Sequence, residues 1–200
     1  VEHYDFDPDR ARGLFREAGY ELAGGKLTKG GRPLALKLLF GPATSSLREG
    51  IATILQQELG RLGVDLEVQG LETGAYLDRL KSEPFDYDLW ILSWSTTVDP
   101  HYSYQIWSEA SIPSLNNGAY VNKEVERLYA EGLRESDRDR RRAVYGRIQR
   151  IINEDLPYVF LYTPLSYVGV NKRIGGIVPK PNLINPSGIE YNMHEWFVRG

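Results

Sequence analysis

Hydrophobic residues along the first half of the chain alternate between helix-like and strand-like spacings. Asp7 and Pro8 are residue types that begin helices, and the apolar face that follows them predicts a helix ending at Gly19. Paired glycines then indicate a hairpin whose second arm is a strand over residues 34–40. This opening segment therefore predicts one helix followed by strands.

Two strand–helix units are predicted after the hairpin. A capping-box spacing at Ser46 opens a helix over residues 47–62, and an alternating strand follows at residues 64–68. A short helix around residues 76–80 leads to an apolar strand over residues 87–93, as expected for a strand buried on both faces. Because such units cross over right-handedly into parallel sheets, the predicted fold class is α/β, with a mixed or parallel sheet flanked by helices.

The second half of the chain is predicted to be mainly helical. Residues 102–118 are rich in Ser, Asn and Pro and predict a surface loop with one short helix near residues 104–107. Asn122 and Asp137 are suitable N-cap residues for two further amphipathic helices. The apolar segment 158–170 is interrupted by a proline and predicts an edge or domain-crossing strand.

These elements predict one α/β lobe over residues 1–168. Residues 169–200 are broken by glycines and prolines, and we expect this tail to pack on the lobe or on another domain of a longer protein. The chain has 200 residues with 42% hydrophobic content, which suffices for one full-sized core. Its first residues lack the basic start and apolar stretch of a signal peptide, so we expect a chain cut from something longer.

Charge and composition exclude several classes of function. A net charge of -3 argues against nucleic acid or an anionic membrane as the main partner. The basic run at residues 138–142 lies among acidic residues of a predicted helix and indicates a solvated charged face. Cysteine is absent and the histidines are far apart in sequence, so no metal site or cofactor is expected. Common nucleotide-binding and serine-nucleophile motifs are also missing.

The most informative segment is residues 85–100, FDYDLWILSWSTTVDP, which predicts a buried strand that runs into a polar loop. Ligands of open α/β sheets bind beyond the carboxyl ends of strands, where this loop would present an exposed aromatic ring, hydroxyls and a carboxylate. The loop is therefore predicted to be a small-molecule recognition edge. Two plainer readings stay open, with Trp94 as a core residue and Asp99 as a turn residue before Pro100.

A catalytic carboxylate pair is the alternative chemistry for this segment. Asp86 and Asp88 lie at the entry end of the strand and Asp99 follows it, much as two acids flank the sugar bond in a glycosidase. At roughly 3.3 Å per residue, the strand separates them too widely for one acid pair, so we expect strand-entry acids instead. Residues 41–46 similarly offer either an anion site at a helix N-terminus or simple helix capping.

Four stretches of the chain together resemble one family of transport proteins. They are DPDRARGLFREAGY (7–20), IATILQQELGRLGVDLEV (51–68), the segment FDYDLWILSWSTTVDP, and NNGAYVNKEVERLYAEGLRESDRDRRRAVYGRIQRIINEDLPYVFLYTP (116–164). Their order is similar to that in the extracytoplasmic solute-binding proteins of the peptide, nickel and oligosaccharide class, family 5, which supply ABC importers. The chain resembles the C-terminal lobe of these proteins, a periplasmic-binding-protein type II lobe.

This resemblance implies a two-lobed hinge protein in the periplasm or on the outer face of the cytoplasmic membrane, with or without a lipid anchor. Its partners would be a solute, an ABC permease in the membrane and the N-terminal lobe of the same protein. Residues 158–168 would lead back to that lobe. The resemblance implies neither enzymatic activity nor a cofactor. Because both lobes must close on a ligand, the chain alone is expected to bind weakly or not at all.

In peptide-binding relatives the loop after this strand reads Trp-x-x-Asp, and its Asp pairs with the free amino group of the ligand. Here Trp94 matches the tryptophan, and Thr97 stands where the Asp would be. A hydroxyl in place of a carboxylate loses a charge-assisted hydrogen bond, which favours neutral or hydroxyl-rich ligands unless Asp99 takes over the pairing. The ligand-binding residues predicted from the resemblance are Trp94, Ser95, Thr96, Thr97, Asp99, Tyr76, Tyr102 and Tyr104.

The expected ligand is an oligopeptide-like solute. An oligosaccharide or another neutral solute is the alternative within the same family, because aromatic side chains near hydroxyls stack well on sugars. Outside transport, the alternatives are a carbohydrate-active enzyme that uses Asp99 and a protein-interaction module with a flat apolar patch.

Overall fold

The computed structural model describes residues 1–95, 97, 99–164, 169–178 and 190–199. The chain divides into two compact units, which we name by their content. The sheet unit consists of His3–Ser93 and Ile112–Ala119, and the helical unit consists of Val1–Glu2, Trp94–Ser111 and the chain from Tyr120 onward. The lobe predicted over residues 1–168 and the tail over residues 169–200 stay predictions.

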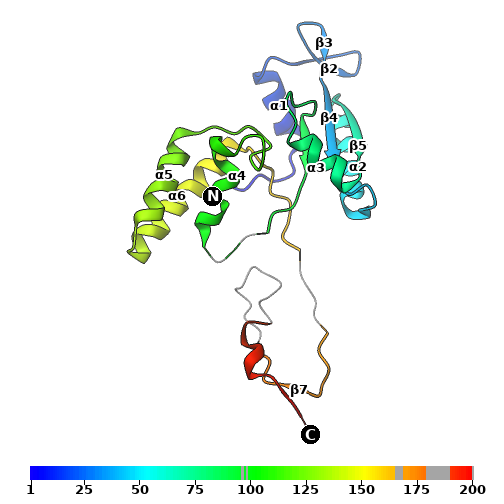
Figure 1. Ribbon diagram of the computed structural model, residues 1–200. Helices are drawn as coiled ribbons and strands as arrows, with labels where there is room; N and C mark the ends of the chain where they lie inside the picture. The colour runs from blue at the N-terminus through cyan, green and yellow to red at the C-terminus, as the bar shows by residue number, and fades with distance from the viewer. Residues whose placement is uncertain (96, 98, 165–168, 179–189, 200) are drawn as a thin grey trace. The chain divides into compact units, whose positions relative to one another are not determined.

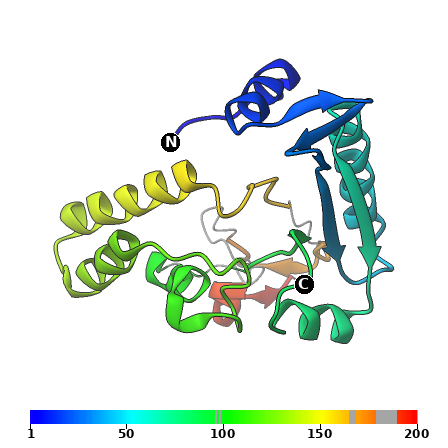
Figure 2. The same ribbon diagram turned by 90° about the horizontal axis from the view of Figure 1, so that it is seen from above.

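A three-stranded parallel sheet forms the main layer of the sheet unit, in the order β5-β4-β6. Its strands are β4 (Ala35–Phe40), β5 (Asp65–Gly70) and β6 (Leu89–Ile91). The connections are α2 (Ser46–Arg61) between β4 and β5, and α3 (Thr73–Leu80) between β5 and β6. Figure 2 shows β4 and β5 running in the same direction with α2 along them. The predicted α/β class with a parallel sheet flanked by helices is confirmed.

Each face of this sheet is covered by a different helix. Leu38 of β4 packs with Ala52 of α2, whereas Leu39 packs with Tyr76 of α3. Successive strand residues point to opposite faces, so both faces exclude water, as the apolar runs predicted. Residues 89–91 of β6 alternate between the same two clusters, although this strand is shorter than predicted.

The predicted hairpin is replaced by a separate antiparallel sheet of three short strands. These are β1 (Glu21–Ala23), β2 (Lys26–Lys29) and β3 (Arg32–Pro33). Its turns at residues 24–25 and 30–31 use positive φ angles, which favour glycine. The strand predicted over residues 34–40 is confirmed as β4, but it is not a hairpin arm, because the antiparallel pairing ends within β1–β3 and β4 pairs with β5 and β6 in the parallel sheet.

Helix starts in the sheet unit follow local capping chemistry. Asp7 accepts two backbone N–H hydrogen bonds and begins α1 (Pro8–Glu17), as predicted. The N-cap of α2 is Ser45, whose hydroxyl accepts from the N–H of Arg48 at 3.4 Å, and not Ser46 as the sequence predicted. Both residues are serines, so the pattern alone could not distinguish them.

The helical unit contains two long helices that pack against each other. They are α5 (Lys123–Arg134) and α6 (Arg138–Asp155), which lie side by side in Figure 1. Asn122 and Asp137 cap these helices as predicted. The loop before them contains α4 (Tyr104–Trp107) between two short 3-10 turns, η1 (Pro100–Ser103) and η2 (Glu109–Ser111).

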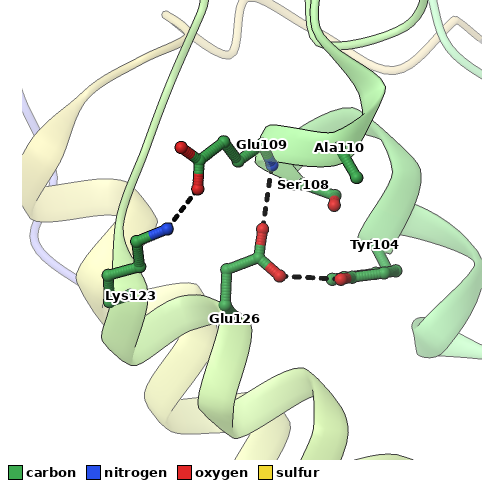
Figure 3. Close-up of a pocket in the computed structure, with 6 residues that line it drawn as sticks. All are labelled: Tyr104, Ser108, Glu109, Ala110, Lys123 and Glu126. Atoms are coloured by element: carbon green, nitrogen blue, oxygen red, sulfur yellow. Dashed lines mark hydrogen bonds and ion pairs between the residues drawn. The ribbon is translucent and has the colours of Figure 1, made fainter.

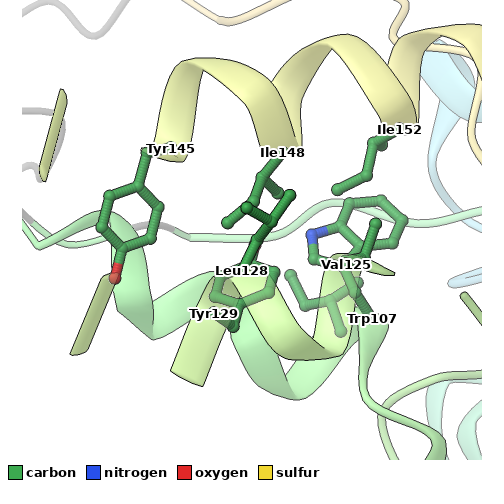
Figure 4. Packing of buried hydrophobic residues seen from close by; sticks show 8 residues of the cluster. Trp107, Val125, Leu128, Tyr129, Tyr145, Ile148 and Ile152 are labelled. Atoms are coloured by element: carbon green, nitrogen blue, oxygen red, sulfur yellow. The ribbon is translucent and has the colours of Figure 1, made fainter. Parts of the chain in front are cut away.

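The core of the helical unit lies between α4, α5 and α6, as Figure 4 shows. Its buried members are Ile106, Trp107, Val125, Leu128, Tyr129, Tyr145, Ile148 and Ile152. Gly132 permits this packing, because a Cβ at that position would lie 2.9 Å from the Tyr145 ring. The segment 102–118, predicted as surface, therefore contributes core residues through α4.

Residues 158–164 and 169–170 have no regular secondary structure, so they form no edge strand within this chain, while the domain-crossing alternative stays a prediction. Val159 and Phe160 are 74% and 63% exposed, and no neighbouring strand among the described residues supplies ladder partners. Residues 165–168 of the predicted strand lie outside the described part of the chain.

Two further short strands follow in the chain. β7 (Ile174–Gly175) pairs antiparallel with β8 (Phe197–Val198), and the turn η4 (Glu190–Glu195) precedes β8. Within the described ranges, no helix is both long and apolar enough to cross a membrane.

Candidate functional site

The loop of residues 94–104, which we call the recognition loop, belongs to the helical unit. Its first residue, Trp94, packs against the core cluster of α4, α5 and α6 and is only partly exposed. Its indole Nε1 is buried, and burial raises the pKa of the neighbouring Tyr158 hydroxyl. Trp94 is therefore largely a core residue and not the exposed aromatic ring that the sequence predicted.

Three hydroxyl-bearing residues of the recognition loop face solvent. Ser95, Thr97 and Tyr102 are exposed, and Tyr102 keeps 53% of its accessible surface. The Thr97 hydroxyl donates to the carbonyl oxygen of Asp99 at 3.3 Å. Thr96 lies outside the described residues. Polar groups on this loop are thus accessible to a solute.

Asp99 already has two partners inside the protein. Its Oδ1 atom accepts from the backbone N–H of His101 at 2.8 Å and from Arg141 Nη2 at 2.8 Å. The His101 N–H and the Arg141 guanidinium hold the pKa of the Asp99 carboxyl below its ordinary value. Asp99 is also the N-cap of η1, which agrees with its reading as a turn residue.

The ion pair with Arg141 was not foreseen from the sequence. The prediction of a solvated charged face holds for Arg140, whose side chain is 72% exposed and pairs with Glu135. The same prediction does not hold for Arg141, whose side chain is 28% exposed and forms an ion pair with Asp99. Arg141 lies 42 positions after Asp99 in the sequence, and no local pattern connects the two residues.

The other two acids of the hypothetical catalytic pair have structural partners in the sheet unit. Asp86 forms an ion pair with Arg79, whose Nε donates to Asp86 Oδ1 at 2.6 Å. Asp88 accepts from the backbone N–H of Lys37 in β4 at 2.8 Å. Both are strand-entry acids, as expected. Among the described residues, no group of three His, Cys, Asp or Glu side chains is placed to hold a metal ion.

Tyr76 lies in the core of the sheet unit and is only 1% exposed. Its hydroxyl donates to the Ile91 carbonyl at 2.8 Å, and its ring lies so close to Gly41 that a Cβ there would be 2.6 Å away. The ring therefore has almost no free surface for the predicted ligand contact. The segment 41–46 caps α2 through Ser45, which agrees with the capping interpretation.

Tyr104 lines a pocket of about 370 Å³ that opens to solvent, shown in Figure 3. The lining residues are Tyr104, Ser108, Glu109, Ala110, Lys123 and Glu126. Glu126 accepts from the Tyr104 hydroxyl at 2.7 Å and from the backbone N–H of Glu109 at 2.8 Å, and Lys123 pairs with Glu109. Burial raises the pKa of Glu126, but these donors outweigh it and leave the pKa below its ordinary value. The polar groups of this pocket largely satisfy one another.

The chain is similar to curated solute-binding proteins over most of its length. It is 27% identical over 203 residues to the oligopeptide-binding protein AppA of Bacillus subtilis, a match that covers 99% of this chain and 36% of the relative. It is 28% identical over 188 residues to the nickel-binding periplasmic protein of Escherichia coli, covering 90% and 33%. The chain thus spans about a third of the length of these relatives.

The chain is also similar in structure to solved solute-binding proteins. The oligopeptide-binding protein AppA from Bacillus subtilis, in complex with a nonapeptide, matches with a TM-score of 0.81 and 26% identity over 100% of this chain and 39% of that one. DppA from Helicobacter pylori, in complex with the peptide STSA, matches with a TM-score of 0.65 and 26% identity over 80% and 29%. NikZ from Campylobacter jejuni shares the fold, with a TM-score of 0.77 and 23% identity over 98% of this chain and 40% of that one.

A family model described as bacterial extracellular solute-binding proteins, family 5 Middle, matches residues 1–113. This family consists of binding proteins and not of enzymes. The match covers the parallel sheet, its helices and the recognition loop. The chain therefore belongs to family 5 of the bacterial extracellular solute-binding proteins.

Proposed function

We propose that the intact protein is an extracytoplasmic receptor that binds an oligopeptide-like solute and delivers it to an ABC permease. This chain would form its C-terminal lobe. The observation that carries the proposal is the match over the full chain to an oligopeptide-binding protein solved with a nonapeptide, at a TM-score of 0.81. Relatives named as periplasmic proteins support the location outside the cytoplasm.

The recognition loop would contribute hydrogen bonds and shape to the ligand site. Ser95, Thr97 and Tyr102 are exposed and carry hydroxyls, and Thr96 is a further candidate from the sequence. Trp94 and Tyr104 would form the less exposed wall behind them. With Asp99 held by Arg141, the loop offers no unmatched carboxylate at the positions described here.

The chemistry of the loop has a measurable consequence for peptide ligands. A charge-assisted hydrogen bond contributes about 1.5–3 kcal/mol, whereas a neutral one contributes about 0.5–1.5 kcal/mol. Removing the charge of a peptide's amino group should therefore cost about tenfold in affinity or less, because about 1.4 kcal/mol corresponds to a factor of ten.

The test is calorimetric titration of the full-length protein with peptides of two to nine residues, their N-acetylated forms, maltooligosaccharides and Ni(II)–L-histidine. Peptide binding that survives N-acetylation supports the proposal. Binding of oligosaccharides alone supports the neutral-solute alternative, which the exposed hydroxyls beside an aromatic ring favour. Failure to bind any of these solutes refutes the proposed function.

A further inference from the structure

Four consecutive polar contacts hold the recognition loop to the two long helices of the helical unit. The pairs are Asp99–Arg141, His101–Tyr145, Ser103–Tyr129 and Tyr104–Glu126. In each pair one partner lies in or just before η1 and α4, and the other lies on α5 or α6. The exposed Tyr102 lies between two of these fastened positions, and the exposed Thr97 precedes the first of them and donates to the Asp99 carbonyl.

The Arg141 side chain contacts both long helices as well as the recognition loop. Its Nε donates to the Gly132 carbonyl at 3.0 Å, and its Nη2 donates to Asp99 at 2.8 Å. The guanidinium also lies over the Tyr145 ring, 5.0 Å from its centroid, with Nη2 3.4 Å from the Tyr145 hydroxyl. One planar group therefore joins the last turn of α5, the first turn of α6 and the start of η1.

A lysine could not reproduce this arrangement. Its ammonium is a single point charge, whereas the guanidinium presents several donors in a fixed plane and stacks on aromatic rings. Replacement of Arg141 by Lys keeps the charge opposite Asp99 but cannot hold Gly132 and Asp99 at once with the same geometry. The Arg141→Lys variant therefore separates a role in geometry from a role in charge alone.

We propose that Arg141 is the positioning residue of the recognition loop, which it fastens through Asp99 so that Thr97 and Tyr102 are presented to the solute in one fixed conformation. This proposal rests on the proposed function. Asp99 is then a structural carboxylate and does not contact the ligand. A loop that is fixed before binding loses less conformational freedom when the solute arrives, which is how the contact would raise affinity.

The first test measures the loop in the ligand-free, full-length protein. Hydrogen–deuterium exchange of the amides of residues 99–107 should become about tenfold faster in Arg141→Ala and in Arg141→Lys. The matched control is Arg140→Ala, one position earlier on the same helix, which should leave this exchange unchanged because Arg140 pairs with Glu135 and not with the loop. Unchanged exchange in Arg141→Ala overturns the proposal.

The second test measures affinity with whichever of the nonapeptide, tripeptide, maltooligosaccharide and Ni(II)–L-histidine probes binds the wild type. Arg141→Ala should bind about tenfold more weakly, and Arg140→Ala should bind within a factor of two of the wild type. Asp99→Asn keeps a side-chain oxygen for the η1 cap but loses the charge, and it should weaken binding by a similar factor. The double variant should be no worse than Arg141→Ala, because both changes break the same contact.

The outcomes of the two tests are distinguishable. Faster exchange with unchanged affinity overturns the positioning role, because the contact would then hold the loop without serving the solute. If the wild type binds no probe, the proposed function fails, while the exchange comparison still decides whether Arg141 holds the loop. Should Arg141→Ala fail to fold, Arg141→Lys and Asp99→Asn provide the same comparison.

Discussion

Replacing Tyr76 by Phe tests whether this residue is a core residue or a ligand contact. The change keeps the ring against Gly41 and removes only the hydroxyl that donates to the Ile91 carbonyl at 2.8 Å. A typical hydrogen bond contributes about 0.5–1.5 kcal/mol, and a buried acceptor that loses its donor costs about 1–3 kcal/mol. Since Tyr76 is 1% exposed, we expect a loss of about 1.5 kcal/mol in local stability and no change in solute affinity.

Native-state hydrogen exchange of the β4 and β6 amides in the full-length protein measures this loss, because it reports the free energy of opening region by region. A loss of about 1.5 kcal/mol corresponds to roughly tenfold faster exchange. Tyr102→Phe is the matched control, since Tyr102 is 53% exposed on the recognition loop and should affect affinity without affecting exchange. Unchanged exchange together with weaker binding in Tyr76→Phe would refute this reasoning.

Three further predictions concern the helical unit and the chain as a whole. The pKa of Asp99 is lowered in the folded protein, so its contribution to stability is present above its unfolded pKa of about 3.8 and is lost as the pH falls through the lower folded value. The stability difference between wild type and Asp99→Asn, measured by urea unfolding, should therefore be constant above about pH 3.8 and shrink as the pH falls further. Gly132→Ala should lower the midpoint of thermal unfolding. A Cβ 2.9 Å from the Tyr145 ring destabilises the packing by about 1–3 kcal/mol, while the better helix propensity of Ala stabilises the helix by only about 1 kcal/mol. An unchanged midpoint would contradict this prediction. The chain of 200 residues by itself should show no heat of binding with a peptide that the full-length protein binds, whereas retained micromolar affinity would contradict the two-lobe requirement.

Features set by neighbouring residues could be predicted from the sequence. Asp7, Asn122 and Asp137 were predicted as N-caps and are N-caps, because capping joins a side chain to amides two or three positions away. The parallel sheet was predictable for a related reason, since short strand–helix–strand connections allow few topologies. The wrong choice of Ser46 over Ser45 shows the limit of such local patterns.

Features that depend on distant residues could not be predicted in this way. Trp94 and Tyr76 were both expected at a ligand, because an aromatic side chain in a strand or helix has the same sequence pattern whether it faces a cleft or a core. Their burial follows from which elements pack together, and that depends on the whole chain. The contact of Arg141 with Asp99 spans 42 positions and is likewise a product of tertiary packing.

The charge balance of the recognition loop leads to the last consequence for the solute. A ligand ammonium that approached Asp99 would compete with a guanidinium already 2.8 Å away, and Thr97 offers it only a neutral oxygen. Selection by this loop would therefore depend on hydrogen bonds and shape more than on charge. If N-acetylation instead reduced peptide affinity a hundredfold, or about 2.7 kcal/mol, a carboxylate would have to contact the amine. Asp99→Asn identifies that carboxylate: the effect of acetylation disappears in the variant if Asp99 is the contact, and it persists if the acid lies elsewhere in the intact receptor.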